Sequence, residues 1–281
     1  IIVDGVGAGG RGNYVLNVGI SSTPPPVNDA CSGAIDISAG GTFTGSTAVA
    51  TDDHSYSCTP SAAGGRDVWY AFTLTRRELV YIDTVDGNTW DTVLQLRSGA
   101  CGAATAVQCA DDQCRSYSGG LRSRIVAELD AGTYLVIVDG YSAGSAGSFT
   151  LRFQHSPCVG ATAIPANGGY NGTTVGAGND LSATCGGSAA PDALYYVAMC
   201  ASRAVTFTTC STTTVFDTVV YVRAGTCDAA TDLACNDNDP LCSSGSLKST
   251  AVALLPQGLS FVAVDGFFSA EGAYRLTVGG M

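Results

Sequence analysis

The acidic side chains of this sequence gather in short segments beside cysteines. Cys109 is followed by Ala-Asp-Asp, and Cys235 is followed by Asn-Asp-Asn. Calcium binds about six to eight oxygen ligands, and a loop fixed by a cysteine presents several of them at little ordering cost. The sequence therefore predicts a calcium site in each half of the chain. The predicted ligands are Asp91, Asp111 and Asp112 in the first half and Asp217, Asp237 and Asn238 in the second.

The same aspartates have a second interpretation, because Asp also forms turns well. Their spacing differs from the Asp-x-Asp-x-Asp-Gly pattern of EF-hand loops, and no distant Glu follows. Two further acidic segments, 52–53 and 179–180, leave both interpretations open. The Asp-Gly pairs at Asp4, Asp139 and Asp265 are predicted to form turns at the ends of strands.

Twelve cysteines in an acidic chain with one lysine indicate disulfide bonds and an oxidising compartment. Zinc is the competing interpretation, but the chain has no Cys-x-x-Cys motif, and His54 and His155 do not occupy matching positions. The expected pairs are Cys101–Cys109, Cys227–Cys235, Cys31–Cys58 and Cys158–Cys185, with Cys200 and Cys210 bridging each other or a neighbouring strand.

This pairing leaves over Cys114 and Cys242, one in each half of the chain. Either the true pairing differs and a thiol is buried and inert, or these cysteines form a covalent link between the halves or between chains. The sequence leaves both interpretations open.

No catalytic centre is indicated. A Ser-His-Asp triad needs a histidine between nucleophile and acid, and neither His54 nor His155 accompanies a Gly-x-Ser-x-Gly motif. A glycosidase needs two carboxylates with separate roles, and nothing singles out such a pair among 21 Asp and 3 Glu. The net charge of −11 disfavours nucleic acid, because phosphate binding needs a basic surface. We therefore expect neither enzyme activity nor nucleic-acid binding.

The sequence repeats with a period of about 127 residues. Cys31 and Cys158 are 127 positions apart, as are Cys58 and Cys185, and the segment 91–101 recurs as 217–227. The first twenty residues match only the closing piece of this repeat. The predicted divisions are a closing hairpin of a preceding or partner module at 1–20, a Pro-rich linker at 21–27, and two modules at 28–154 and 155–281.

Apolar residues alternate along several segments of each module. Val68, Tyr70, Phe72 and Leu74 follow the period of two that a half-buried strand requires. No segment shows a helical stripe, and no apolar run approaches the roughly 20 residues of a membrane span. The predicted strands of the first module are 42–49, 67–74, 79–83, 92–97, 124–129, 133–139 and 148–153. Seven or eight strands in each module predict an all-β chain of two tandem, jelly-roll-like β-sandwiches.

Four motifs follow one another in the first module: Asp-Thr-Val-Leu-x-Leu-Arg at 91–97, Cys-x-Asp-Asp at 109–112, Leu-x-Ala-Gly-Thr-Tyr-Leu-Val-x-Val-Asp-Gly at 129–140, and Gly-Ser-Phe-Thr-Leu at 147–151. In this order they resemble the bacterial pre-peptidase C-terminal (PPC) domain, in its cysteine-containing form found in tandem in large secreted proteins. The resemblance extends over both modules and the first twenty residues. The second module departs from it at 254–259 and in its extra cysteines, Cys200 and Cys210.

This resemblance implies a β-sandwich that accompanies secreted enzymes and surface proteins without being catalytic, and some related sandwiches bind calcium or polymeric substrates. We therefore expect a non-catalytic, structural or adhesive repeat protein, extracellular or on a bacterial cell surface. It would belong to a filament, matrix or surface array and contact copies of itself, neighbouring modules or an extracellular polymer. The alternative is a pair of accessory modules that bind the substrate or carbohydrate of a secreted peptidase or other hydrolase.

Overall fold

A computed structural model describes residues 3, 7, 9–16, 23–55, 58, 64–84, 89–114, 121–186, 189–243 and 247–281. Over these residues the protein is built from β-strands, with one short 3₁₀ helix, η1 (Cys31–Gly33), and no α-helix. The all-β class predicted from the alternating pattern is confirmed. No helix in the described part of the chain is long and apolar enough to cross a membrane.

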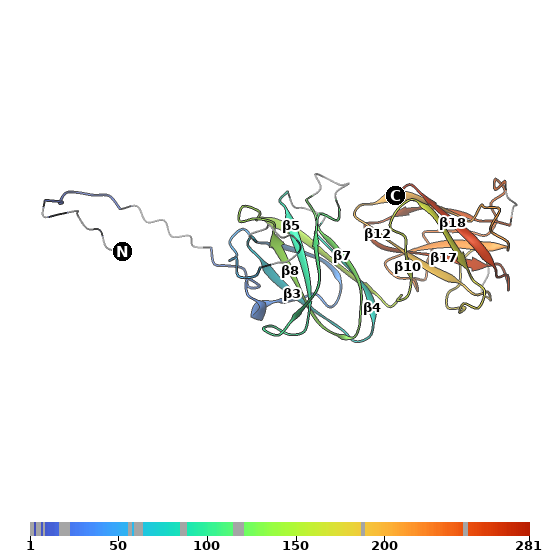
Figure 1. Ribbon diagram of the computed structural model, residues 1–281, viewed down its shortest axis with the longest axis horizontal. Helices are drawn as coiled ribbons and strands as arrows, with labels where there is room; N and C mark the ends of the chain where they lie inside the picture. The colour runs from blue at the N-terminus through green and yellow to red at the C-terminus, as the bar shows by residue number, and fades with distance from the viewer. Residues whose placement is uncertain are drawn as a thin grey trace.

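The first sandwich packs two sheets face to face (Figure 1). One sheet has the order β1 (Ile35–Asp36), β3 (Val68–Leu74), β8 (Gly132–Gly140), β5 (Thr92–Ser98) and β6 (Thr105–Asp111). The other has the order β2 (Gly41–Ser46), β9 (Ser148–Ser156), β4 (Glu78–Asp83) and β7 (Arg124–Leu129). The pairs β2·β9, β3·β8, β4·β7 and β5·β6 make this a hairpin folded over on itself, which is the jelly-roll arrangement.

The second sandwich has the same topology. One sheet has the order β10 (Thr162–Ala163), β12 (Ala193–Met199), β17 (Gly258–Gly266), β14 (Thr218–Ala224) and β15 (Ala234–Asn236). The other has the order β11 (Gly168–Thr173), β18 (Ala273–Gly279), β13 (Arg203–Thr208) and β16 (Thr250–Leu255). The sequence repeat is therefore a repeat of structure.

The core of each sandwich follows from the alternation in its sequence. Val68, Tyr70, Phe72 and Leu74 are all buried between the two sheets of the first sandwich. The strand β6 is absent from the predicted set. Its first residues, from Thr105 to Val107, are exposed at the edge of the sheet, so they carry little apolar signal.

The predicted closing hairpin at 1–20 lies in part outside the described residues. Its described residues 9–16 form turns and extended chain with no strand, and they lie away from the first sandwich (Figure 1). Tyr14, Val15 and Leu16 are exposed there. A single hairpin arm has no sheet to join, and an isolated hairpin is only marginally stable.

An apolar seam joins the two sandwiches. Leu79 and Tyr81 of β4 pack with Leu259 and Phe261 of β17 in one buried cluster that draws on both halves of the chain. The strand β9 also runs on to Ser156, beyond the predicted division at 154/155. The outward face of one sheet in each sandwich is therefore buried by the other sandwich.

Polar contacts line this seam. The Tyr81 hydroxyl donates to the carbonyl of Met199 at 2.9 Å, and the Gln257 amide donates to the buried carboxylate of Asp83 at 3.1 Å. The Arg124 guanidinium donates to the carbonyl of Ala198, and the amide of Leu259 donates to the Gln154 side chain at 2.9 Å. The seam is thus ordered by directional bonds as well as by apolar burial.

Candidate metal centre and disulfide framework

Three aspartates of the first sandwich meet at one end of the β5–β6 pair. Asp91 immediately precedes β5, Asp111 ends β6, and the register that pairs Val93 with Asp111 brings them together. Asp112 follows in the left-handed conformation, with φ at 64°, which Asp tolerates better than most residues. One carboxylate oxygen from each aspartate lies within 4.8 Å of the others. In the described part of the chain, no other group of three such residues is this close.

The electrostatics of this acid cluster favour a cation. Burial, together with the nearby carboxylates of Asp111 and Asp112, raises the pKa of Asp91 to about 6. One oxygen of Asp91, Oδ1, is buried and accepts no hydrogen bond. Three carboxylates in one half-buried place repel one another, whereas a divalent cation would bind all three. The donor set is thus chemically suited to Ca²⁺.

The second sandwich brings together only part of the matching set. Burial and then the charge of Asp237 raise the pKa of Asp217, but the charge of Lys248 lowers it. Lys248 is buried, and its ammonium group donates to the carbonyl of Phe216 at 3.5 Å. The third position is Asn238, whose amide donates to Asp237 at 3.0 Å. An amide therefore stands where the first sandwich has its third carboxylate, while the buried Lys248 holds the position that the buried Arg122 holds in the first sandwich.

The twelve cysteines form six disulfides, and every specific pairing predicted above is wrong. The predicted pairs Cys101–Cys109, Cys227–Cys235, Cys31–Cys58 and Cys158–Cys185 do not form. The observed bonds are Cys31–Cys101, Cys58–Cys109, Cys114–Cys200, Cys158–Cys227, Cys185–Cys235 and Cys210–Cys242.

The reason lies in the jelly-roll register. Cys109 sits opposite Gln95, in the middle of the β5–β6 ladder, whereas Cys101 lies in the turn beyond the end of that ladder. Neighbours along the chain therefore do not meet. Each bonds instead to a segment that precedes β3, Cys101 to Cys31 and Cys109 to Cys58.

Cys114 and Cys242, which the predicted pairing left without partners, form different kinds of disulfide. Cys114 bonds to Cys200, so the predicted covalent link between halves is present within one chain. Cys242 bonds to Cys210 in its own sandwich, so the predicted link through Cys242 is wrong.

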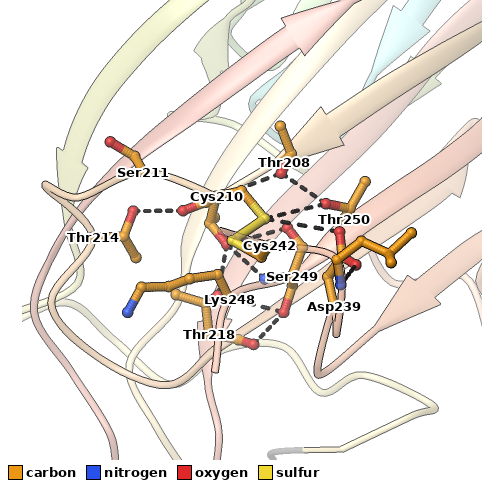
Figure 2. The surroundings of a disulfide bond; sticks show 12 residues. Thr208, Cys210, Ser211, Thr214, Thr218, Asp239, Cys242, Lys248, Ser249 and Thr250 are labelled. Carbon is orange, nitrogen blue, oxygen red and sulfur yellow. Dashed lines mark hydrogen bonds between the residues drawn. A yellow bond between two sulfur atoms is a disulfide. The ribbon is translucent and has the colours of Figure 1, made fainter. Parts of the chain in front are cut away.

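Figure 2 shows Cys210–Cys242 in a shell of hydroxyl groups. The amide of Cys210 donates to Thr208 at 3.1 Å, and the Ser249 hydroxyl donates to the carbonyl of Asp237 at 2.6 Å. These contacts fix the acidic loop of the second sandwich to its own strands β13 and β16. In the first sandwich the corresponding loop is fixed to the neighbouring sandwich through Cys114.

Both histidines make contacts with neighbouring strands. His155 Nδ1 pairs with the buried carboxylate of Glu78 next to the seam. His54 contacts Gln95 at 3.3 Å and packs edge-on against Trp69.

No protein-family model and no curated protein matches the chain. Among solved structures, the chain is similar to the pre-peptidase C-terminal domain of a collagenase from Bacillus anthracis. The identity is 13% and the TM-score is 0.31, over 48% of this chain and 100% of that one. It is also similar to a cycloisomaltooligosaccharide glucanotransferase from a Paenibacillus species, complexed with cycloisomaltoheptaose. There the identity is 12% and the TM-score is 0.22, over 80% of this chain and 45% of that one. Similarities this distant say nothing about what this chain binds.

Proposed function

We propose that this chain is a non-catalytic structural element of an extracellular filament, matrix or surface array, in which the two sandwiches act as one rigid unit. The observation that carries the proposal is the seam, where the Cys114–Cys200 bond accompanies a buried apolar cluster drawn from both sandwiches. A flexible pair of binding modules needs no such surface, whereas an element that transmits position or force between neighbours does.

Three further features support this proposal. Six disulfides suit an oxidising, extracellular compartment. The contacts of His54 and His155 account for both histidines without a catalytic role. The acid cluster of Asp91, Asp111 and Asp112 offers a site where extracellular Ca²⁺ would fix the end of the first sandwich.

The test is negative-stain electron microscopy of the chain in non-reducing buffer, with Ca²⁺ and with a chelator. We expect two-bead particles with a constant separation between beads that associate into ordered arrays. Dispersed two-bead particles at every concentration would overturn the array role and favour the alternative, accessory modules of a secreted hydrolase.

A matched variant tests the rigid unit separately. We expect Cys114→Ser with Cys200→Ser to widen the distribution of bead separations and to lose ordered association. The control is Cys210→Ser with Cys242→Ser, which removes a disulfide but leaves the link between sandwiches intact. An unchanged bead separation after loss of Cys114–Cys200 would show that the unit does not depend on this bond.

A further inference from the structure

A second pair of carboxylates lies buried in the first sandwich, apart from the acid cluster. Asp67 immediately precedes β3 and Asp139 is the last residue but one of β8. The register that pairs Val68 with Val138 places these aspartates side by side. Both have an exposed fraction of 0%. The prediction that Asp139 forms a turn is therefore wrong, because Asp139 lies on a strand and its carboxylate is buried on the outward face of the sheet; Asp4 lies outside the described residues.

The hydrogen bonds of this pair satisfy it only in part. Asp67 Oδ2 accepts the backbone amides of Asp53 and His54, each at 3.1 Å. Asp139 Oδ1 accepts the backbone amide of Gly65 at 3.1 Å. The other oxygen of Asp139, Oδ2, is buried and has no hydrogen-bond partner. A buried carboxylate oxygen without a partner is strongly unfavourable, so this atom calls for a ligand.

Further oxygen atoms lie beside Gly64 and Gly65, the second of which donates its amide to Asp139. A Cβ atom added to Gly65 would lie 2.6 Å from the carbonyl oxygen of Ser142 and 3.0 Å from that of Gly140. A Cβ atom added to Gly64 would lie 3.4 Å from Oδ1 of Asp52. The neighbourhood of Asp139 is thus rich in carbonyl and carboxylate oxygens, which are the ligands of hard divalent cations.

The charges around the pair are of one sign. Burial, together with the carboxylates of Asp67 and Asp52, raises the pKa of Asp139 to about 8. Burial also raises the pKa of Asp67 to about 7, with the charge of Asp53 acting in the same direction. The local field therefore favours a positive ligand.

We infer that Asp67 and Asp139 bind a divalent cation of the Ca²⁺ type at a site distinct from the acid cluster, with the carboxylate of Asp52 beside the neighbouring Gly64. Val93 lies between the two places, because it pairs with Asp139 on one side and with Asp111 on the other. Two strand spacings separate Asp139 from Asp111, which is about 10 Å. The outward face of this sheet would thus carry two cations side by side at one end.

The second sandwich repeats the buried pair but not the whole site. Asp192 accepts the amides of Asp180 and Leu181, and Asp265 Oδ2 is buried without a hydrogen-bond partner. Sequence alignment of the modules puts Ala190 at the position of Gly65 and Asn179 at that of Asp52. One carboxylate fewer and an added methyl group predict weaker cation binding there.

Each of the two tryptophans is close in sequence to one of the two sites, and this makes the sites separately observable. Trp69 follows Asp67 by two residues, and Trp90 immediately precedes Asp91. Tb³⁺ replaces Ca²⁺ at oxygen sites and emits when a nearby tryptophan is excited. Trp90→Phe restricts this emission to the Trp69 site, and Phe216 already holds the matching position in the second sandwich.

The experiment measures Tb³⁺ emission and calorimetric Ca²⁺ binding on the full chain in non-reducing buffer, after chelator treatment. In the Trp90→Phe background we expect strong Tb³⁺ emission that Ca²⁺ displaces. Asp139→Asn should abolish it and remove one bound Ca²⁺, whereas Asp91→Asn should leave it intact. Asp265→Asn is the matched control in the second sandwich and should leave the Trp69 emission unchanged.

One set of results would overturn the inference: wild type and Asp139→Asn binding equal numbers of Ca²⁺ with equal Trp69-sensitised emission. The pair would then share a proton rather than a metal. Asp52→Asn alters an exposed residue and serves as a second variant if Asp139→Asn does not fold. We expect it to weaken binding at this site at least tenfold, and unchanged affinity would also overturn the inference. Loss of binding in Asp91→Asn alone would affect only the acid cluster.

Discussion

The two sandwiches share their strand order but fix the same loop in different ways. In the first, Asp111 and Asp112 at the end of β6 cluster with Asp91 before β5, and the loop that follows is bonded to the neighbouring sandwich through Cys114–Cys200. In the second, Asn238 replaces the third carboxylate, and Cys210–Cys242 closes the loop after β15 on its own strands. The acidic loop of the first sandwich is thus fixed by a bond to its neighbour, whereas that of the second is fixed within its own sandwich.

The sequence shows how this asymmetry is arranged. Two cysteines of the second sandwich have no counterpart in the first. Cys200 follows β12, whereas Thr75 follows the matching strand β3. Cys210 lies two residues after β13, and the matching sequence position after β4 is Val85. The first sandwich therefore has no cysteine at the position where Cys200 of the second sandwich bonds to Cys114. The second sandwich bonds its own acidic loop through Cys210 and Cys242.

The largest expected effect concerns an ion pair found only in the second sandwich. Arg223 and Asp232 are both buried and their side chains are 2.8 Å apart, whereas alignment puts Ala106 opposite Arg97 in the first sandwich. Asp232→Asn leaves a buried guanidinium without its charge partner, so the free energy of unfolding should fall by about 3–5 kcal/mol. Denaturant unfolding followed by hydrogen exchange should locate the loss in the second sandwich.

The same ion pair predicts a pH dependence. Burial opposes the charge of Asp232, but hydrogen bonds from Thr184 and Arg223 overcome this and hold its pKa below the ordinary value of 3.8. A lowered pKa contributes stability above the unfolded value and loses it as the pH falls. The difference between wild type and Asp232→Asn should therefore shrink below about pH 4. A difference that stays constant from pH 7 to pH 3 would contradict this account.

The next effect compares two disulfides of different role. Replacing Cys210 and Cys242 by Ser should lower the stability of the second sandwich by about 2–4 kcal/mol, since the unfolded chain gains freedom. Replacing Cys114 and Cys200 should instead speed hydrogen exchange at the seam and leave both cores protected. Equal loss of protection in the two cores would show that the sandwiches unfold as one unit.

A smaller effect concerns two buried tyrosines, Tyr81 in the first sandwich and Tyr221 in the second. Tyr81 donates to Met199 across the seam, whereas the hydroxyl of the equally buried Tyr221 makes no hydrogen bond. Tyr81→Phe removes this bond and the contact of the same hydroxyl with the buried carboxylate of Asp83, and it should lower the free energy of unfolding by about 1–3 kcal/mol. Tyr221→Phe should change it by less than about 0.5 kcal/mol. Thermal unfolding of both variants in parallel provides the comparison, and equal losses would contradict it.

The alternation of apolar residues predicted most strands, because the residues that a strand buries are visible in that strand's own sequence. The run from Leu79 to Ile82 also held a signal for the seam, since a strand with apolar residues on both faces must be covered twice. The disulfides were not predictable from spacing, because bonds such as Cys31–Cys101 and Cys58–Cys109 join segments that are distant in sequence and meet only in the folded sandwich. Asp139 looked like a turn residue, because only the loops around Gly65 and Ser142 cover it.

The smallest expected effect comes from exchanging the residues at one position that differs between the two acidic loops, Asp112 in the first and Asn238 in the second. Asp112→Asn removes one of three carboxylates but adds no backbone strain, because Asn also tolerates the left-handed conformation that Asp112 adopts. Calorimetry should show Ca²⁺ affinity at the acid cluster falling about tenfold, which is about 1.4 kcal/mol. The reciprocal Asn238→Asp restores the third carboxylate of the second sandwich. A buried basic residue stands at the same position in both sandwiches, Arg122 in the first and Lys248 in the second, so the gain should match the loss in the first. A gain much smaller than that loss would mean that the carboxylate count alone does not decide binding.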